Sequence, residues 1–149
     1  MLDKFNFRKV HAKVEQMKKE LPKVLANDTK NYFVEEYNKQ SWNGSAWKEV
    51  ERRIAGTSAY KYPKKGADAR HGRAILVKSG KLRRDVVNSL ERADFNMIKF
   101  VVKNDYGIYH NEGSSKSNLP QRQFMGDNPT LRARQLNKIK SYLARIWQT

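Results

Sequence analysis

Residues 108–126, IYHNEGSSKSNLPQRQFMG, form the most distinctive stretch of this 149-residue chain. An aromatic residue, a histidine, a polar residue, an acid and a glycine lead into a Ser/Lys/Asn loop. Leu-Pro, an isolated arginine and Phe-Met-Gly follow. Gly113 predicts a turn because glycine adopts backbone conformations that side chains disfavour, and Pro120 stiffens the chain before Arg122. The stretch therefore predicts a folded connector with an exposed loop at 114–118.

Apolar residues at helical spacing predict long helices on both sides of this stretch. Near the start they recur at intervals of three and four, at Phe7, Val10, Val14, Met17 and Leu21. Pro22 then either kinks this helix or begins a second one over about 23–39. After the connector, Asn128 is expected to cap a helix that begins at Pro129. Its apolar stripe is expected to hold Leu136, Ile139, Leu143, Ile146 and Trp147.

Shorter elements are predicted between these helices. Asn-Gly within 42–47 indicates a turn, and 48–54 could form another helical turn. Ser79 could cap a helix that carries Leu82, Val86 and Leu90 on one face. Alternation over 95–103 predicts a strand, and 104–107 is typical of a turn. We therefore predict an α+β fold, with long N-terminal helices and a C-terminal helix around a small antiparallel sheet.

Length and composition favour one domain over residues 1–149. Hydrophobic residues make up 38% of the chain, enough for one modest core. The segment 56–72, GTSAYKYPKKGADARHG, has no sustained periodicity and predicts a flexible basic loop or arm. No stretch approaches the roughly 20 apolar residues of a membrane helix, so no membrane partner is expected. The chain has no cysteine, which excludes disulfides and thiolate metal sites.

The formal net charge of +16 makes a polyanionic partner plausible. Residues 52–84 hold eleven Lys and Arg against one acid, Asp68. This segment could be a solvated face, a surface facing DNA, or a surface facing acidic patches on a neighbouring subunit. The candidates for contact with DNA or another anion are Lys61, Lys64, Lys65, Arg70, Arg73, Arg83 and Arg84.

The sequence does not indicate an enzyme. The three histidines are scattered, and only His110 has an acid close by, Glu112. On a strand these two side chains would share a face and could form half a metal site or an acid–base pair; otherwise His110 holds a turn through a hydrogen bond. Residues 78–81 lack the spacing of a phosphate-binding loop. We expect no catalytic residue, cofactor or metal.

Three groups of residues occur in an order that resembles phage virion-morphogenesis proteins, the tail-completion or head–tail joining family. The first is the tryptophan-containing turn at 42–47. The second is Leu-Val-Lys-Ser-Gly-Lys-Leu-Arg at 76–83. The third combines Tyr-His-Asn-Glu-Gly at 109–113 with Leu-Pro-Gln-Arg-Gln-Phe-Met-Gly at 119–126. Gln121 and Gln123 replace the usual Ala and Pro, which leaves the backbone around Arg122 less rigid.

The resemblance implies a structural virion protein that acts in tail completion or head–tail (neck) joining. It also implies a homo-oligomeric ring, commonly a hexamer, that contacts neighbouring neck, portal or tail proteins and lines a passage for DNA. Such a protein would be made in the host cytoplasm and reside in the virion. An arginine fork suits carboxylates or carbonyls across an interface, although Arg122 could equally form a salt bridge within its own subunit. The candidate interface residues are Tyr109, His110, Glu112, Arg122 and Phe124.

Two other functions remain open from the sequence. A nucleic-acid-binding protein would use the basic 52–84 segment, in which Tyr60 and Tyr62 are interleaved with cations. A metal nuclease would use His110 and Glu112.

Overall fold

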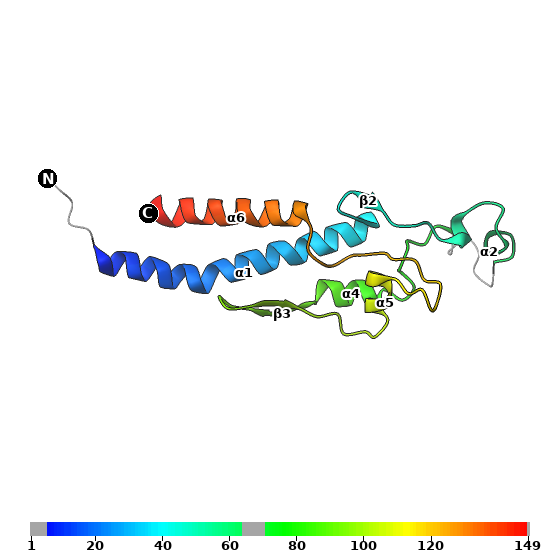
Figure 1. Ribbon diagram of the computed structural model, residues 1–149, viewed down its shortest axis with the longest axis horizontal. Helices are drawn as coiled ribbons and strands as arrows, with labels where there is room; N and C mark the ends of the chain where they lie inside the picture. Colours follow the sequence, from blue (N-terminus) through cyan, green and yellow to red (C-terminus); the bar gives the residue numbers. More distant parts are fainter. Residues whose placement is uncertain (1–5, 64–70, 149) are drawn as a thin grey trace. The chain divides into compact units, whose positions relative to one another are not determined.

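The computed structural model of the chain describes residues 6–63 and 71–148. Two long helices, α1 (Phe7–Lys39) and α6 (Pro129–Gln148), accompany short helices and antiparallel hairpins, which confirms the α+β class (Figure 1). The chain divides into two compact units. Unit 1 comprises residues up to Tyr32, Leu90–Val101 and Asp127 onward, and unit 2 comprises Phe33–Ser89 and Val102–Gly126. A single domain over the whole chain stays a prediction.

Helix α1 continues through Pro22. It is one helix of 33 residues with Pro22 inside it, so no second helix begins there. Before Pro22, no described residue of α1 is buried, and the predicted stripe from Val10 to Leu21 is only half-buried. Phe7, the first residue of that stripe, is 76% exposed. The packed part of the helix therefore begins at Pro22.

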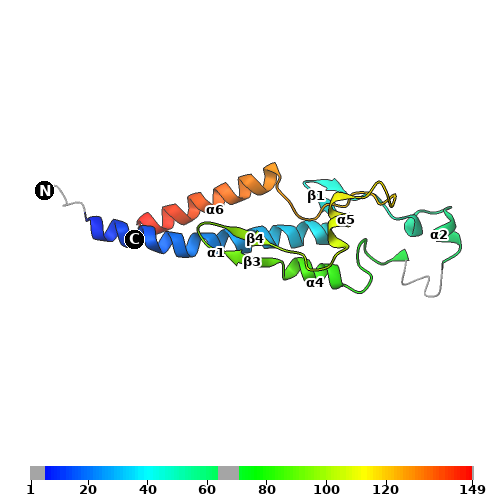
Figure 2. The ribbon, with the colours of Figure 1, turned by 60° about the horizontal axis from the view of Figure 1, so that its bottom comes forward.

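In unit 1, α6 lies beside α1, as Figures 1 and 2 both show. The buried apolar side chains are Ala26 and Tyr32 of α1 and Leu131, Tyr142 and Ile146 of α6. Polar bonds also join the two helices: Asp28 accepts two hydrogen bonds from the Arg134 guanidinium, and Tyr142 Oη donates to Glu20. Part of the predicted α6 stripe is wrong, because Leu136 and Trp147 are about half exposed.

The predicted cap of α6 is confirmed. Asn128 Oδ1 accepts a hydrogen bond from the Leu131 backbone N–H at 2.8 Å, and Pro129 is the first helical residue. The Asn128 amide also bonds with the Tyr32 hydroxyl, so the cap is tied to α1.

The hairpin of unit 1 differs from the prediction. Strand β3 (Leu90–Ala93) pairs antiparallel with β4 (Ile98–Phe100). Leu90 therefore belongs to a strand and not to the preceding helix, and the strand predicted over 95–103 shortens to three residues. Asp94 forms the turn by accepting the backbone N–H groups of Asn96 and Met97 on its Oδ1.

Unit 2 is built around an aromatic cluster. Tyr37, near the end of α1, packs edge-on against Trp47 and Phe124, with ring centroids 5.4 and 5.6 Å apart. The Tyr37 hydroxyl donates to the Leu76 carbonyl at 2.9 Å, and burial raises the pKa of Tyr37. Ile75, Leu82 and Val86 are also buried in this unit.

Short elements surround this cluster. Strands β1 (Ser41–Trp42) and β2 (Ser45–Ala46) form a hairpin. The Asn43-Gly44 turn between them is confirmed, with positive φ at both residues. The 3₁₀ helix η1 (Glu51–Arg53) lies within the predicted helical turn, and α2 (Ser58–Lys61) lies within the segment predicted as a loop. Residues 64–70 of the predicted arm lie outside the described residues.

Helix α4 (Lys81–Val87) buries Leu82 and Val86, as predicted, but Ser79 is not its cap. Gly80 occupies that position in the left-handed conformation, with φ of 72°, which glycine adopts at little cost. Ser79 instead accepts a hydrogen bond from the Lys81 N–H on its hydroxyl. In the described part of the chain, no helix combines the length and apolar character needed to span a membrane.

Candidate interface and basic pocket

The histidine of the distinctive stretch lies on a helix, α5 (Gly107–Glu112). Successive residues of an α-helix are about 100° apart around its axis, so His110 and Glu112 point in nearly opposite directions. The expectation that they share a face, which assumed a strand, is therefore wrong. No group of three or more His, Asp and Glu residues suited to a metal ion occurs among the described residues.

Asn111 holds the connector in place. Its Oδ1 accepts hydrogen bonds from the backbone N–H groups of Phe124 and Met125, both at 3.0 Å, and its Nδ2 donates to the Met125 carbonyl at 3.1 Å. The predicted turn is present at Gly113, which has φ of 78°. Ser114 and Leu119 exchange two backbone hydrogen bonds and close a loop whose residues 115–118 are exposed. The predicted connector and its exposed loop are confirmed.

Arg122 lies inside unit 2. Its side chain is 6% exposed, its N–H donates to the His110 carbonyl at 2.8 Å, and its Nε donates to the Lys48 carbonyl at 3.1 Å. Among the described residues Arg122 forms no salt bridge, so of the two alternatives the internal salt bridge is not present, and a bond to the Lys48 carbonyl is found instead. Burial lowers the pKa of Arg122, and the Glu49 carboxylate acts in the opposite direction.

The candidate interface residues separate into a core group and a surface group. Phe124 is 1% exposed and packs against Tyr37, so it belongs to the core and offers no surface to a partner. Tyr109 is 56% exposed on α5, and Glu112 is also exposed. His110 is half-buried, its Nδ1 has no hydrogen-bond partner among the described residues, and burial lowers its pKa.

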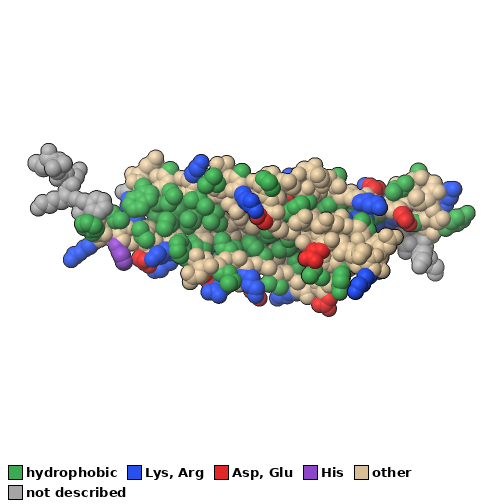
Figure 3. All heavy atoms as spheres, in the orientation of Figure 1, with side chains coloured by type: hydrophobic (Ala, Val, Ile, Leu, Met, Phe, Trp, Pro, Cys, Tyr) green, Lys and Arg blue, Asp and Glu red, His purple; other side chains and the backbone are tan. Residues whose placement is uncertain are grey.

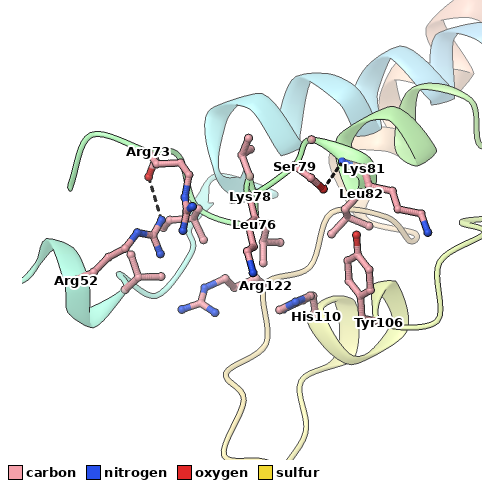
Figure 4. A pocket seen from close by; sticks show the side chains of 14 residues that line it. Arg52, Arg73, Leu76, Lys78, Ser79, Lys81, Leu82, Tyr106, His110 and Arg122 are labelled. Carbon is pink, nitrogen blue, oxygen red and sulfur yellow. Dashed lines mark hydrogen bonds between the residues drawn. The ribbon is translucent and has the colours of Figure 1, made fainter. Parts of the chain in front are cut away.

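A pocket of about 510 Å³ opens beside Arg122 and His110. Backbone from Ile75 to Leu82 forms one wall, and Tyr106 and His110 form part of another (Figure 4). Arg52 is held at one end, where its Nη2 donates to the carbonyls of Arg73 and Ala74 at 3.0 and 3.3 Å. Five cationic side chains and no carboxylate line the pocket: Arg52, Arg73, Lys78, Lys81 and Arg122.

The pocket brings together residues from the two predicted sites. Arg73 was a candidate for anion contact, and His110 and Arg122 were interface candidates. Arg52 and Lys78 belong to the basic segment, but nothing in their local sequence separates them from its other cations. Asn111 was missed because it occupies a variable position of the motif; an amide two residues before a glycine turn was the available signal.

The remaining anion-contact candidates do not line this pocket. Lys61 is exposed on α2. Arg83 and Arg84 are exposed on α4, and the Arg84 Nη1 donates to the Ser79 carbonyl. Lys64, Lys65 and Arg70 lie outside the described residues.

Comparison of this chain with protein-family models, with curated proteins and with solved structures found no match. The resemblance to virion-morphogenesis proteins is therefore a hypothesis that rests on the sequence pattern.

Proposed function

We propose that the protein is a structural subunit of a phage virion that acts in tail completion or head–tail (neck) joining. In this role it assembles into a homo-oligomeric ring, with a hexamer as the expected form, and contacts neighbouring neck, portal or tail proteins. A basic surface of the ring faces DNA. The ordered motif residues of the sequence suggest this family, and the α+β fold is compatible with it.

The observation that carries the proposal is an exposed apolar face at α5. Ile108 and Tyr109, which are adjacent on α5, are 57% and 56% exposed. Single exposed apolar side chains are ordinary, but grouped ones mark interaction surfaces. Asn111 accepts from the Phe124 N–H and donates to the Met125 carbonyl, and the Arg122 N–H donates to the His110 carbonyl. These bonds fix the helix on its unit, so the face is preorganised for a partner and little ordering entropy is lost on contact.

Unit 1 also exposes apolar side chains. Phe7, Leu136 and Trp147 are each about half exposed or more, and Figure 3 shows hydrophobic side chains gathered over the adjacent parts of α1 and α6. A subunit that keeps such surfaces uncovered is well suited to assembly.

Charge supports the orientation towards DNA. Arg52, Arg73 and Lys78 line both the basic pocket and a neighbouring hollow of about 400 Å³. A surface with one sign of charge attracts the phosphate backbone regardless of base sequence, as a passage for DNA requires.

The assembly proposal is tested by sedimentation and electron microscopy of the purified chain, alone and with neck, portal or tail proteins from the same genome. The wild type is expected to form rings. Tyr109→Asp should abolish them, because a carboxylate would be desolvated at the interface. Phe95→Asp is the matched control: Phe95 is equally exposed, at 56%, but lies in the β3–β4 turn.

A wild-type chain that stays monomeric at high concentration and with its partners would overturn the proposal. Equal loss of rings in both variants would refute the assignment of the interface to α5. Tight binding of free duplex DNA by a monomer, with a steep dependence on salt, would instead favour the nucleic-acid-binding alternative.

A further inference from the structure

We propose that the basic pocket of unit 2 is a nucleotide-binding site, in which the cationic side chains hold a phosphate group and Tyr106 stacks on a base. The ligand is either a free nucleotide or one unit of a nucleic-acid strand. This inference goes beyond the assembly role, because a pocket within one unit binds its ligand whether or not the subunit forms a ring.

The first support is charge. Five formal positive charges and no carboxylate line the pocket, although the Glu49 carboxylate acts on Arg52 and Arg122 from outside the lining. Figure 4 shows Arg52, Arg73, Lys78 and Arg122 converging around one region, whereas Lys81 points away from it. Like charges held close together repel one another, so this arrangement costs stability until an anion enters. Burial and the neighbouring Arg73 both lower the pKa of Arg52 in this environment.

The second support is a set of polar groups without protein partners. Arg122 is 6% exposed, yet only its backbone N–H and Nε donate hydrogen bonds among the described residues. Its terminal nitrogens remain for a ligand. Two other polar atoms of the pocket residues, Arg73 Nε and His110 Nδ1, are fully buried without a partner in the described part of the chain. Buried polar groups are rarely left unpaired, so two such atoms on residues that line one pocket favour a ligand there.

The third support is the size and lining of the pocket. A volume of about 510 Å³ is within the usual range for organic ligands and exceeds the need of a bare phosphate ion. Ile75, Leu82 and Tyr106 contribute apolar side chains to the lining. Tyr106 is 42% exposed, which leaves part of its ring available for a base.

Phosphate fits this charge better than a carboxylate does. A phosphate monoester carries nearly two negative charges near pH 7, and its three oxygens can accept from several cations at once. A single carboxylate brings one charge, which would leave most of the cation group unbalanced. An acidic peptide from a partner is therefore the disfavoured ligand, and the test includes it.

The test is isothermal titration of the full chain at near-physiological salt with three probes. These are deoxyadenosine monophosphate, a short single-stranded oligonucleotide and a glutamate-rich peptide. NMR of the His110 ring is followed in each titration. We expect binding of at least one nucleotide probe, with movement of the His110 resonances. Binding of the monophosphate identifies a free nucleotide as a ligand, whereas binding of the oligonucleotide alone identifies a strand.

Two double variants distinguish binding in the pocket from the general attraction of an anion to a basic protein. Arg73→Gln with Lys78→Gln removes two converging cations and should weaken binding about 100-fold, since each lost charge-assisted contact is worth roughly a factor of 10. Lys103→Gln with Lys116→Gln removes the same charge from exposed sites of unit 2 that do not line the pocket. This control should weaken binding by less than about 2-fold, because salt screens distant charges.

Circular dichroism and urea unfolding establish that both double variants fold. The proposal is overturned if both weaken binding equally, or if the nucleotide probes leave the His110 resonances unmoved. Tighter binding of the glutamate-rich peptide, with the same dependence on Arg73 and Lys78, would also overturn it by assigning the pocket to a protein partner.

Discussion

Replacing Asn111 by alanine should destabilise unit 2 strongly. The side chain makes three hydrogen bonds to the backbone of Phe124 and Met125, at 3.0, 3.0 and 3.1 Å. At about 1 kcal/mol for each bond, Asn111→Ala should lower the free energy of unfolding by about 3 kcal/mol. With a urea slope near 1.5 kcal/mol/M, the unfolding midpoint falls by about 2 M.

Tryptophan fluorescence can follow the unfolding of unit 2 separately from that of unit 1. The chain has three tryptophans, of which Trp42 and Trp47 lie in unit 2 and Trp147 lies in unit 1. A Trp147→Phe background therefore leaves only reporters from unit 2. Gln121→Ala is the matched control, because the Gln121 amide donates one exposed bond, to the Asn111 carbonyl. It should cost no more than about 0.5 kcal/mol. An Asn111→Ala loss equal to that of the control would refute the role of Asn111.

Three further predictions concern stability. Gly113→Ala should lower the free energy of unfolding by about 1–3 kcal/mol, because its Cβ would lie 3.0 Å from the Gln121 nitrogen at a φ of 78°. Gly44→Ala is the control for backbone strain alone, since Gly44 has a φ of 82° and open space around it. Equal losses for the two variants in urea unfolding would disprove the steric contribution at Gly113. Asp28→Asn should cost roughly 1.5–3 kcal/mol in thermal unfolding, since it removes the carboxylate from two charge-assisted bonds with Arg134, and an unchanged melting temperature would contradict this. Burial lowers the pKa of His110 below 6.5, so the folded state favours the neutral ring. The contribution of His110 to the free energy of unfolding should therefore be fully present above pH 6.5, and it should be lost as the pH falls through the pKa of the folded state. His110→Gln should flatten that part of the pH profile, and an unaltered profile would count against the assignment.

The long helices could be predicted because their signals are local. The spacing of apolar residues indicated α1 and α6, and the Asn128-Pro129 pair marked the start of α6 correctly. The face of α6 was less predictable, because Leu136 and Trp147 extend the apolar pattern but are about half exposed, whereas Tyr142 is buried and bonds to Glu20.

The β3–β4 hairpin shows why short elements are harder to predict. Leu90 continues the four-residue spacing of Leu82 and Val86, so periodicity alone extends the helix to it. The structure ends α4 at Val87 and places Leu90 opposite Phe100 in a strand pair. That pairing is a tertiary contact, and strand preference depends strongly on such contacts.

The basic pocket could not be assembled from the sequence. Arg52, Lys78 and Arg122 come from segments far apart in the chain, and each has the same local character as other cations of this basic protein. What distinguishes them is the direction of the side chain and the folded position of each segment around the pocket, which the local sequence does not determine. The connector itself was predictable, because Gly113 and Pro120 restrict the backbone locally.

The β3–β4 hairpin has a consequence for how copies of this chain can meet. In the described part of the chain no third strand joins it, so it presents two sheet edges, and such edges can template pairing with another molecule. Glu91, Arg92 and Lys99 place charges on these strands, and Lys99 forms a salt bridge with Glu91 across the ribbon. Charged side chains discourage further strands from adding at an edge. The charges on this hairpin thus oppose open-ended growth of a sheet from its edges.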